Sequence, residues 1–381
     1  MTPPRIWLSL ALMSGEEQKY IREAFDTNWV APLGPNVNAF EQALSDYLHT
    51  DKKVVALVSG TAAIHLALIQ LGVQPGDEVI CQSFTFVASA NPIRYLGATP
   101  VFIDSEKDTW NMSPVFLKRA IEDRIAKTGK KPKAIIPVHL YGMPARMDKI
   151  MEMANRYNIP VLEDAAEALG SSYMGRKCGT FGEFACLSFN GNKIITTSGG
   201  GALVCSTPEQ GEKTRFYATQ ARDKAPHYQH SEIGYNYRMS NICAGIGRGQ
   251  MKVLDSYVAR RREIHNIYRT HLSNLPGISF LENPASEFES NHWLTCIQVE
   301  PEKAGFTREE LQAAMEAVNI ETRPLWKPMH LQPVYAEAPF YGDGTSGELF
   351  QKGLCLPSSP VLTDDDLIRV TGVFQSLHSE K

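Results

Sequence analysis

Short apolar runs alternate with amphipathic stretches between about residue 50 and residue 205. The apolar runs predict strands at 54–58, 78–81, 100–103, 134–138, 160–162, 185–189 and 202–204. Between them, the periodicity predicts helices that bury one face at 61–71, 113–125 and 145–157. Strands that alternate with helices form βαβ units, in which helices cover both faces of a parallel sheet. The pattern therefore predicts a large α/β domain with a mostly parallel sheet.

The pattern changes after residue 250. We expect here a long charged helix at 251–275, followed by a turn at 276–277. Two strands at 278–281 and 293–299 and a second helix at 307–318 follow. Strands and helices that no longer alternate indicate a separate α+β unit. We therefore predict a large domain at 1–255 and a smaller C-terminal α+β domain at 256–381. The length of 381 residues agrees, because an ordinary domain has ~100–200 residues.

Charge and cysteine content exclude several classes of protein. The 38 Lys and Arg residues against 42 Asp and Glu residues give a net charge of −4, which argues against a general grip on nucleic acid or on an anionic membrane. No run approaches the ~20 apolar residues of a membrane span. The short apolar run at 6–13 leads directly into charged residues, unlike a signal peptide. Seven cysteines without a C-x-x-C pair fit buried, reduced thiols, so we expect a cytoplasmic protein.

Ligands of open parallel sheets bind beyond the carboxyl ends of the strands, so the residues that follow each strand are the candidates for chemistry. After the first predicted strand, Gly60, Thr61 and Ala62 form a turn of small residues that opens a helix. Such a turn directs backbone N–H groups and the positive end of the helix dipole at a phosphate. The alternative is an ordinary strand–helix turn with Thr61 near the N-cap.

An acidic pair ends the predicted strand at 160–162. A buried carboxylate such as that of Asp164 needs a partner, and one suitable partner is the protonated ring nitrogen of pyridoxal phosphate (PLP). Glu167 follows three residues later and would face the same way on a helix. The alternative is a helix N-terminal Asp164 followed by a solvated Glu167.

The predicted strand at 185–189 contains a serine near its end, and a lysine follows it. Ser188 and Lys193 are delivered to the same edge of the sheet, and a glycine-rich turn at 199–201 allows close approach of a ligand. A partly desolvated lysine amine can form a Schiff base with an aldehyde, although most lysines are plain surface residues. Phe86, past another strand, could lie flat on a planar ring or pack in the core. His139 and Tyr141 are further candidates at a strand end.

Together these residues supply a phosphate cradle, an aromatic plate, an acid for a ring nitrogen and a lysine, and this combination indicates PLP. Competing motifs are absent. The glycines at 245, 247 and 249 do not form G-x-G-x-x-G after a strand, and neither a G-x-x-x-x-G-K-[ST] loop nor H-E-x-x-H occurs. We therefore expect no metal site.

The chain resembles, essentially end to end, the fold-type I PLP-dependent sugar-nucleotide aminotransferases of the DegT family. The motifs that carry the resemblance stand at 28–34, 59–63, 83–87, 163–167, 188–193, 234–241, 323–330 and 353–357. The resemblance implies the fold-type I architecture. It also implies that Lys193 is the Schiff-base lysine, that Asp164 faces the pyridine nitrogen, that Glu167 lies near the ring hydroxyl and that Phe86 stacks on the ring.

The resemblance also implies how the phosphate and the substrate are held. The phosphate site would consist of Gly60, Thr61, Ala62 and Ser188, together with Asn236 from the neighbouring subunit of an obligatory homodimer. The N-terminal loop that lines the sugar site would consist of Asn28, Trp29, Val30 and Ala31. Two further residues expected near the nucleotide or sugar are Arg323 and His330.

Within the family, residues 190–201 and 216–222 look most like one branch. That branch transfers an amino group from L-glutamate to C-4 of UDP-2-acetamido-2,6-dideoxy-4-ketohexose, in the bacillosamine pathway of bacterial protein glycosylation. A relative with histidine in place of the lysine is a dehydratase, so Lys193 favours transamination. Two alternatives stay open: a C-4 aminotransferase for another ketosugar, such as a GDP-4-keto-6-deoxyhexose, and a catalytically silent PLP-binding sensor of sugar nucleotides.

Overall fold

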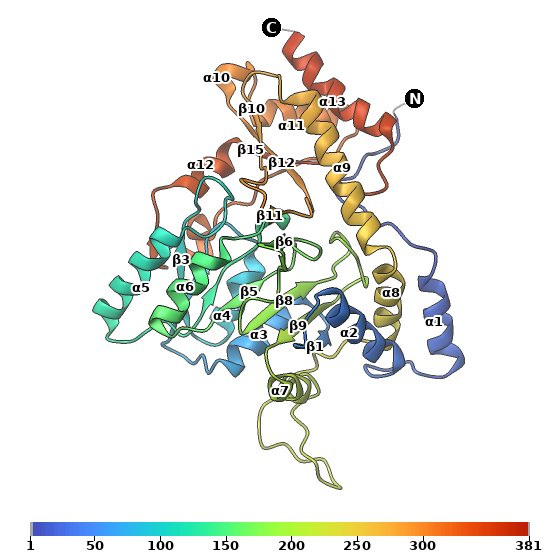
Figure 1. The fold of residues 1–381 in the computed structure, drawn as a ribbon, viewed down its shortest axis with the longest axis vertical. Helices are drawn as coiled ribbons and strands as arrows, with labels where there is room; N and C mark the ends of the chain where they lie inside the picture. Colours follow the sequence, from blue (N-terminus) through green and yellow to red (C-terminus); the bar gives the residue numbers. More distant parts are fainter. Residues whose placement is uncertain (1–2, 380–381) are drawn as a thin grey trace.

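The computed structural model describes residues 3–379 and has a large lower and a small upper part (Figure 1). The large part is built on a sheet with the strand order β14-β3-β2-β4-β5-β8-β9-β1. In chain order its strands are β1 (Lys53–Leu57), β2 (Glu78–Gln82), β3 (Thr99–Ile103), β4 (Ile135–Ile136), β5 (Leu162–Asp164), β8 (Phe184–Ser188), β9 (Gly201–Cys205) and β14 (Phe340–Tyr341). β9 runs antiparallel to both of its neighbours, and the other pairings are parallel. The predicted mostly parallel sheet is confirmed.

Helices cover both faces of this sheet. In β1, Val54 and Ala56 belong to one buried cluster, whereas Val55 and Leu57 belong to another on the opposite face. The first face is covered by α2 (Pro35–Tyr47), α5 (Pro114–Thr128), α6 (Met147–Tyr157) and α8 (Asn241–Met251). The opposite face is covered by α3 (Gly60–Gln70), α4 (Asn91–Tyr95) and α7 (Pro208–Ala218). α1 (Glu17–Asp26) packs against α8.

The small part contains an antiparallel sheet in the order β10-β12-β15-β13. Its strands are β10 (Ile278–Phe280), β12 (Thr295–Val299), β13 (Arg323–Pro324) and β15 (Gly353–Leu356). Its helices are α9 (Leu254–Leu272), α10 (Pro301–Ala304), α11 (Arg308–Ala317), α12 (Thr345–Lys352) and α13 (Asp364–Ser379). Side chains of α9, α11 and α13 bury a third core with this sheet. The α+β character of this region is as predicted.

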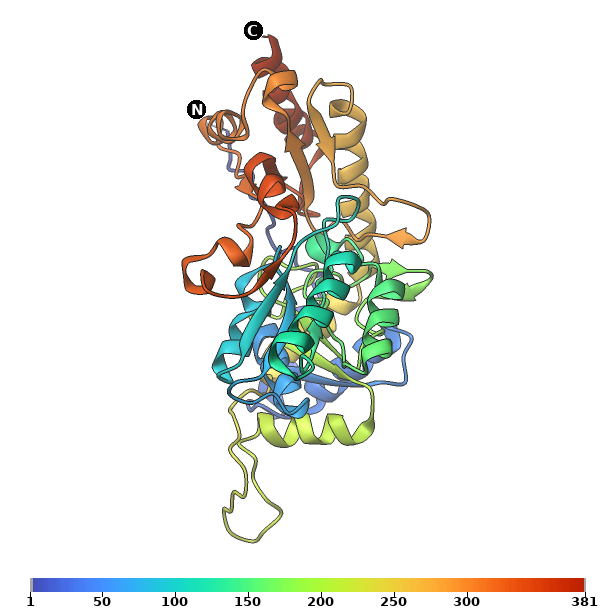
Figure 2. The same cartoon turned by 90° about the vertical axis from the view of Figure 1, so that its left-hand side faces the viewer.

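The division at residue 255 stays a prediction, and two segments lie across it. Ile6 forms a bridge with Ile320 and is buried in the core of the small part. Conversely, β14 pairs with β3 at the edge of the large sheet, where it extends the parallel pairing (Figure 2). The chain therefore crosses between the two parts near both ends.

Three local features differ from the expected pattern. The helix expected at 251–275 is α9, but it is shorter at both ends, because it begins at Leu254, after the non-helical backbone of Val253, and ends at Leu272. A small sheet of β11 (Phe288–Glu289), β6 (Ser172–Tyr173) and β7 (Arg176–Lys177) has no counterpart in the predicted pattern. Residues 219–236, which we call the arm, extend away from the body at the bottom of both ribbon views (Figures 1 and 2).

Two expectations from composition can be compared with residues 3–379. In this range, no helix is both long and apolar enough to cross a membrane. All seven cysteines are free thiols, and six of them are buried, as expected. No group of three or more histidine, cysteine, aspartate or glutamate residues in the described range is placed to hold a metal ion.

Candidate active site

A cavity of about 660 Å³ opens beyond the carboxyl ends of β1, β5 and β8, where ligands of parallel sheets bind. Its floor comes from the large part and includes Ser59, Asp164 and Ser188. The small part closes one side with Trp293 and Trp326. The cavity therefore lies between the two parts of the chain.

Lys193 projects into this cavity from the turn that follows β8, and its side chain is only 12% exposed. Its Nζ atom lies 3.6 Å from Oε1 of Glu167 and 4.2 Å from the ring centre of Trp293. The alternative of a plain surface lysine is therefore wrong. Glu167 supplies a carboxylate next to the amine.

Asp164 is the last residue of β5, lines the cavity and is 5% exposed. Its Oδ2 accepts a hydrogen bond from the Ser89 hydroxyl at 2.6 Å, and its Oδ1 accepts one from the amide of Ala166 at 3.1 Å. Both bonds stabilise and orient the carboxylate in a buried place. A protonated ring nitrogen is a suitable charged partner for such a carboxylate.

Glu167 is buried in a turn, since no helix follows β5. Its Oε2 accepts a hydrogen bond from the amide of Tyr141 at 2.6 Å. Burial raises the pKa of the Glu167 carboxyl to about 7, with Lys193 opposing and Asp164 adding to the shift. The alternative of a solvated Glu167 on a helix is therefore wrong.

The first turn of α3 forms the wall expected to cradle a phosphate. Ser59 is the N-cap of α3, its hydroxyl accepts a hydrogen bond from the amide of Ala62 at 3.1 Å, and Thr61, the second residue of the helix, lies near this cap. Gly60 and Thr61 line the cavity, whereas Ala62 does not. A Cβ atom on Gly60 would lie 3.0 Å from Sγ of Cys186 in β8. The start of the helix therefore lies directly against the strand that leads to Lys193.

Aromatic rings form the roof of the cavity. Phe86 is 51% exposed and lines the cavity, so its ring is not part of the core. The Phe86 ring lies 5.5 Å from that of Trp326, which in turn lies 4.9 Å from Tyr141 and 6.1 Å from Trp293. Trp326 lies within the motif at 323–330, but its role was not predicted from the sequence.

Of the two C-terminal substrate candidates, one lies in the cavity wall. Arg323 lines the cavity, is 66% exposed at its side chain and pairs with Glu321 at 2.7 Å. His330 lies outside the walls: its Nδ1 is 2.7 Å from the Ser83 hydroxyl, and its ring stacks on Phe340. A role for His330 near the substrate stays a prediction.

The N-terminal loop and Asn236 also lie outside the cavity of a single chain. The backbone carbonyls of Trp29 and Ala31 accept hydrogen bonds from Asn241, and Asn28, Trp29 and Val30 are exposed. Asn236 is exposed on the arm. Their expected contacts, including those of Asn236 with the active site of a neighbouring subunit, stay predictions.

The strand-end candidates His139 and Tyr141 are buried and do not line the cavity. Nδ1 of His139 accepts the amide hydrogen of Ala145, so its Nε2 carries the proton and donates to Glu163 at 3.0 Å. Glu163 also accepts hydrogen bonds from the amides of Gly179 and Gly182. This pair orders the loops beneath the cavity.

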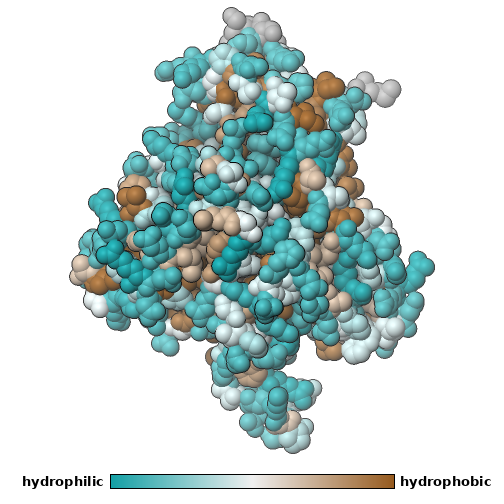
Figure 3. All heavy atoms as spheres, in the orientation of Figure 1, coloured by the Kyte–Doolittle hydropathy of each residue, from teal (hydrophilic) through white to brown (hydrophobic). Residues whose placement is uncertain are grey.

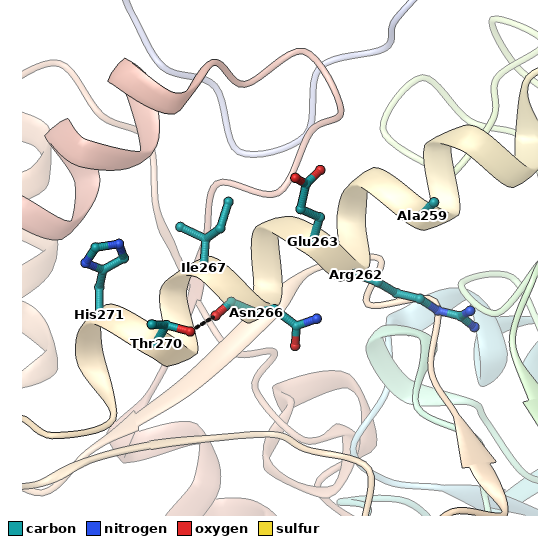
Figure 4. A pocket seen from close by; sticks show the side chains of 7 residues that line it. All are labelled: Ala259, Arg262, Glu263, Asn266, Ile267, Thr270 and His271. Carbon is teal, nitrogen blue, oxygen red and sulfur yellow. Dashed lines mark hydrogen bonds between the residues drawn. The ribbon is translucent and has the colours of Figure 1, made fainter.

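A second hollow, of about 530 Å³, lies along α9 (Figure 4). Its side chains come from one helix and point outward, from Ala259 to His271. The hydrogen bond drawn there joins Thr270 to the backbone of Asn266. Because polar groups from different elements do not converge in it, this hollow is a helix surface and not a reaction site.

Residues 12–375 match the DegT/DnrJ/EryC1/StrS aminotransferase family. The chain belongs to this family. It is 52% identical to "Putative pyridoxal phosphate-dependent aminotransferase EpsN" of Bacillus subtilis, over 98% of this chain and 96% of that protein. It is 38% identical to GDP-perosamine synthase of Caulobacter vibrioides, over 96% of each chain. The fold matches the crystal structure of a DegT DnrJ EryC1 StrS aminotransferase from Brucella abortus, with a TM-score of 0.89, 30% identity and coverage of 96% of this chain and 95% of that chain.

Family membership makes the protein a fold-type I, PLP-dependent aminotransferase that acts on sugar nucleotides. The cavity fits this cofactor. It contains a buried lysine amine, a buried carboxylate at Asp164, an exposed ring at Phe86 and the N-terminus of α3. The residues predicted from the sequence to hold PLP are therefore brought together, apart from Ala62 and Asn236.

Proposed function

We propose that the protein transfers the amino group of L-glutamate to C-4 of UDP-2-acetamido-2,6-dideoxy-4-ketohexose. The product would be UDP-4-amino-4,6-dideoxy-N-acetylglucosamine, for protein or surface glycan biosynthesis. The observation that carries the proposal is the position of Lys193 in a cavity of about 660 Å³, between Glu167 and the ring of Trp293. Free buried thiols fit a reducing compartment, so we place the reaction in the cytoplasm.

The cofactor supplies an electron sink that stabilises negative charge on the substrate carbon next to the amine. Lys193 would bind its aldehyde carbon, Asp164 would face its ring nitrogen, and Phe86 would cover its ring. Gly60 and Thr61, at the N-terminus of α3, would hold the phosphate. These roles follow from the resemblance, and the placement of the residues around one cavity supports them.

The lysine also moves the proton. With its amine free, the Lys193 Nζ atom would take the proton from the α-carbon of glutamate as a general base and would deliver it, as a general acid, to the cofactor carbon that carries the amino group. Glu167 lies 3.6 Å away and accepts the amide hydrogen of Tyr141, which keeps its carboxylate oriented toward the amine. The same groups, used in reverse, place the amine on C-4 of the ketosugar.

The active form is proposed to be a homodimer with shared active sites. The arm extends from the body (Figure 3) and exposes Tyr228 and Ile233, which a neighbouring subunit could cover. Asn236 lies on the same arm and would reach the cofactor phosphate of the neighbour. Asn236→Ala should then weaken PLP binding without changing the sedimentation coefficient of the dimer. A monomeric wild-type protein with full activity would exclude this arrangement.

The test uses the visible absorption spectrum of the protein with PLP, before and after excess L-glutamate. We expect a band of lysine-bound cofactor that disappears on addition of glutamate and returns on addition of the correct ketosugar. Lys193→Ala should bind PLP without this band and lose turnover by on the order of 10³-fold or more. Lys327→Ala, which removes an exposed lysine, is the matched control. Full turnover by Lys193→Ala would refute the assignment.

A GDP-linked 4-keto-6-deoxyhexose is the second candidate substrate. The similarity to GDP-perosamine synthase, at 38% identity over nearly the whole chain, favours it. The two candidates are separated by presenting each ketosugar to the glutamate-treated enzyme and measuring how fast the visible band returns. The better substrate is the one with the higher second-order rate constant. A band that glutamate does not change would instead favour a catalytically silent sensor.

A further inference from the structure

The backbone carbonyl of Asn192, the residue before Lys193, accepts two hydrogen bonds from distant parts of the chain. The Ser9 hydroxyl donates one at 2.8 Å, and the indole Nε1–H of Trp293 donates the other at 2.7 Å. Ser9 belongs to the N-terminal segment and Trp293 to the small part. The turn that carries the reactive lysine is therefore fixed from two sides by residues outside the large sheet.

Arg261 of α9 connects the two donors. Its Nη1 donates to the carbonyl of Trp293 at 2.5 Å, and its Nη2 donates to the Ser9 hydroxyl at 3.2 Å. Arg261 and Trp293 are both buried, the latter 2% exposed. Asn192, Ser9, Arg261 and Trp293 thus form a closed ring of hydrogen bonds, and this ring restricts the position of the indole.

Asn291 places the two groups that face the Lys193 amine. Its Oδ1 accepts the amide hydrogen of Trp293 at 2.8 Å, and its Nδ2 donates to the backbone carbonyl of Glu167 at 2.8 Å. The Glu167 carboxylate lies 3.6 Å from Lys193 Nζ, and the Trp293 ring centre lies 4.2 Å from it. Carboxylate and indole face are both attractive to a lysine cation, and in a desolvated place the attraction of the ring is strong.

We infer that Trp293 is a positioning residue for Lys193. Its N–H fixes the backbone before the lysine, and its ring face receives the lysine cation whenever the side chain is not bonded to the cofactor. This inference rests on the proposed function of Lys193. A long lysine side chain loses much rotational freedom when it is held, so a fixed resting place shortens the search for the next carbon that it must reach.

The inference assigns two separable roles to one side chain. Trp293→Phe removes the N–H and keeps an aromatic face, whereas Trp293→Leu removes both. Ser9→Ala removes the second donor to the Asn192 carbonyl and leaves the indole side chain of Trp293 unchanged. Phe288→Leu is the control for loss of a buried ring, because Phe288 is as buried as Trp293 and does not line the cavity.

The primary measurement is the rate at which the apo protein forms lysine-bound cofactor after mixing with PLP, followed by stopped-flow absorbance. We expect Trp293→Leu to be slower by about 10-fold or more, while Trp293→Phe stays within about 3-fold of the wild type. The turnover number kcat of Trp293→Leu should fall in parallel, with the KM for glutamate changed by less than about 2-fold.

The two donors to Asn192 should be partly interchangeable. Ser9→Ala and Trp293→Phe should each slow capture of the cofactor by at most about 3-fold, because one hydrogen bond to the carbonyl remains. The double variant should be slower than the product of the two single effects. These two variants keep the inference testable even if Trp293→Leu does not fold.

Three results would overturn the inference. The first is capture of PLP by Trp293→Leu at the wild-type rate. The second is an equal slowing by Phe288→Leu, which would mean that loss of any buried ring has this effect. The third is a double variant whose slowing equals the product of the two single effects. Failure of the proposed role of Lys193 would give a different result from failure of this inference. In that case the Lys193→Ala protein would still form the visible band with PLP.

Discussion

Oε1 of Glu167 lies 3.6 Å from Nζ of Lys193, and its Oε2 accepts the amide hydrogen of Tyr141 at 2.6 Å. One buried carboxylate therefore contacts both the reactive amine and the backbone of a neighbouring turn. Tyr141 has a positive φ of 54°, which is uncommon for a residue other than glycine, and this hydrogen bond stabilises that conformation. The protonation of Glu167 thus affects the amine and the turn together.

The first prediction concerns the pH dependence of stability of the apo protein. Burial raises the pKa of Glu167 to about 7 from an ordinary value near 4.5. Between these values the folded protein retains a proton that the unfolded chain has lost, so its stability falls as the pH rises through this window. The free energy of unfolding should therefore fall by up to ~3 kcal/mol between pH 4.5 and 7, and Glu167→Gln should abolish this decrease. Thermal melting of both proteins across this range is the measurement, and parallel curves would contradict the prediction.

The second prediction concerns Asp164. Asp164→Asn keeps the shape of the side chain and removes its charge, so the proposed charge-assisted hydrogen bond to the cofactor nitrogen, worth ~1.5–3 kcal/mol, would be lost. We expect kcat to fall by about 10- to 100-fold while the lysine-bound band still forms. Ser89→Ala, which removes only the 2.6 Å hydrogen bond to Oδ2, should have a smaller effect. An Asp164→Asn enzyme with wild-type kcat would rule out the assigned role.

The third prediction compares Gly199, in the turn before β9, with Gly201, the first residue of β9. A Cβ atom on Gly201 would collide with the backbone of Ser59, whereas one on Gly199 would meet no atom within 4 Å. Gly201→Ala should displace the start of α3 and raise the dissociation constant of PLP by about 10-fold or more. Gly199→Ala should change it by less than about 2-fold. Fluorescence titration of each apo protein with PLP measures the dissociation constants. Equal values for the two variants would exclude a phosphate site that depends on close packing of Gly201 against Ser59.

The fourth prediction separates substrate binding from chemistry. Arg323 lines the cavity, and its exposed pair with Glu321 contributes less than ~1 kcal/mol to stability. Arg323→Ala should raise the KM for the nucleotide sugar by about 10-fold and leave the half-reaction with glutamate unchanged. Lys327→Ala removes a nearby exposed cation and serves as the comparison. An effect confined to the glutamate half-reaction would place Arg323 at the amino donor instead.

The predicted cofactor residues that line the cavity share one property: each stands at the end of a strand of the large sheet or a few residues after it. Asp164, Ser188 and Gly60 stand at strand ends, and strand ends of a parallel sheet meet at one edge, so local pattern was sufficient to place them. Lys193 is five residues beyond such an end and was found by its glycine-rich surroundings. The burial of these side chains was harder to predict from the sequence. Glu167, for example, is buried by loops from several segments of the chain.

The residues that the sequence did not indicate come from remote segments. Ser9 and Trp293 reach the cavity only after the N-terminal segment and the small part have packed against the large part. A serine in a short apolar run and a tryptophan before a strand carry no local signal of such a role. The start of α9 differs by three residues from the expected one, since the amphipathic pattern includes residues 251–253 while the backbone of Val253 is not helical.

The edge strand of the large sheet is supplied by residues 340 and 341, which pair with β3. Asp104, directly after β3, fixes the turn that follows this strand by accepting hydrogen bonds from the amides of Gly344 and Ser346. During synthesis, almost the entire chain must therefore leave the ribosome before the sheet can be complete. The strands β10, β12 and β13 of the small part are therefore synthesised before the large sheet can be completed, whereas β15 and α13 follow.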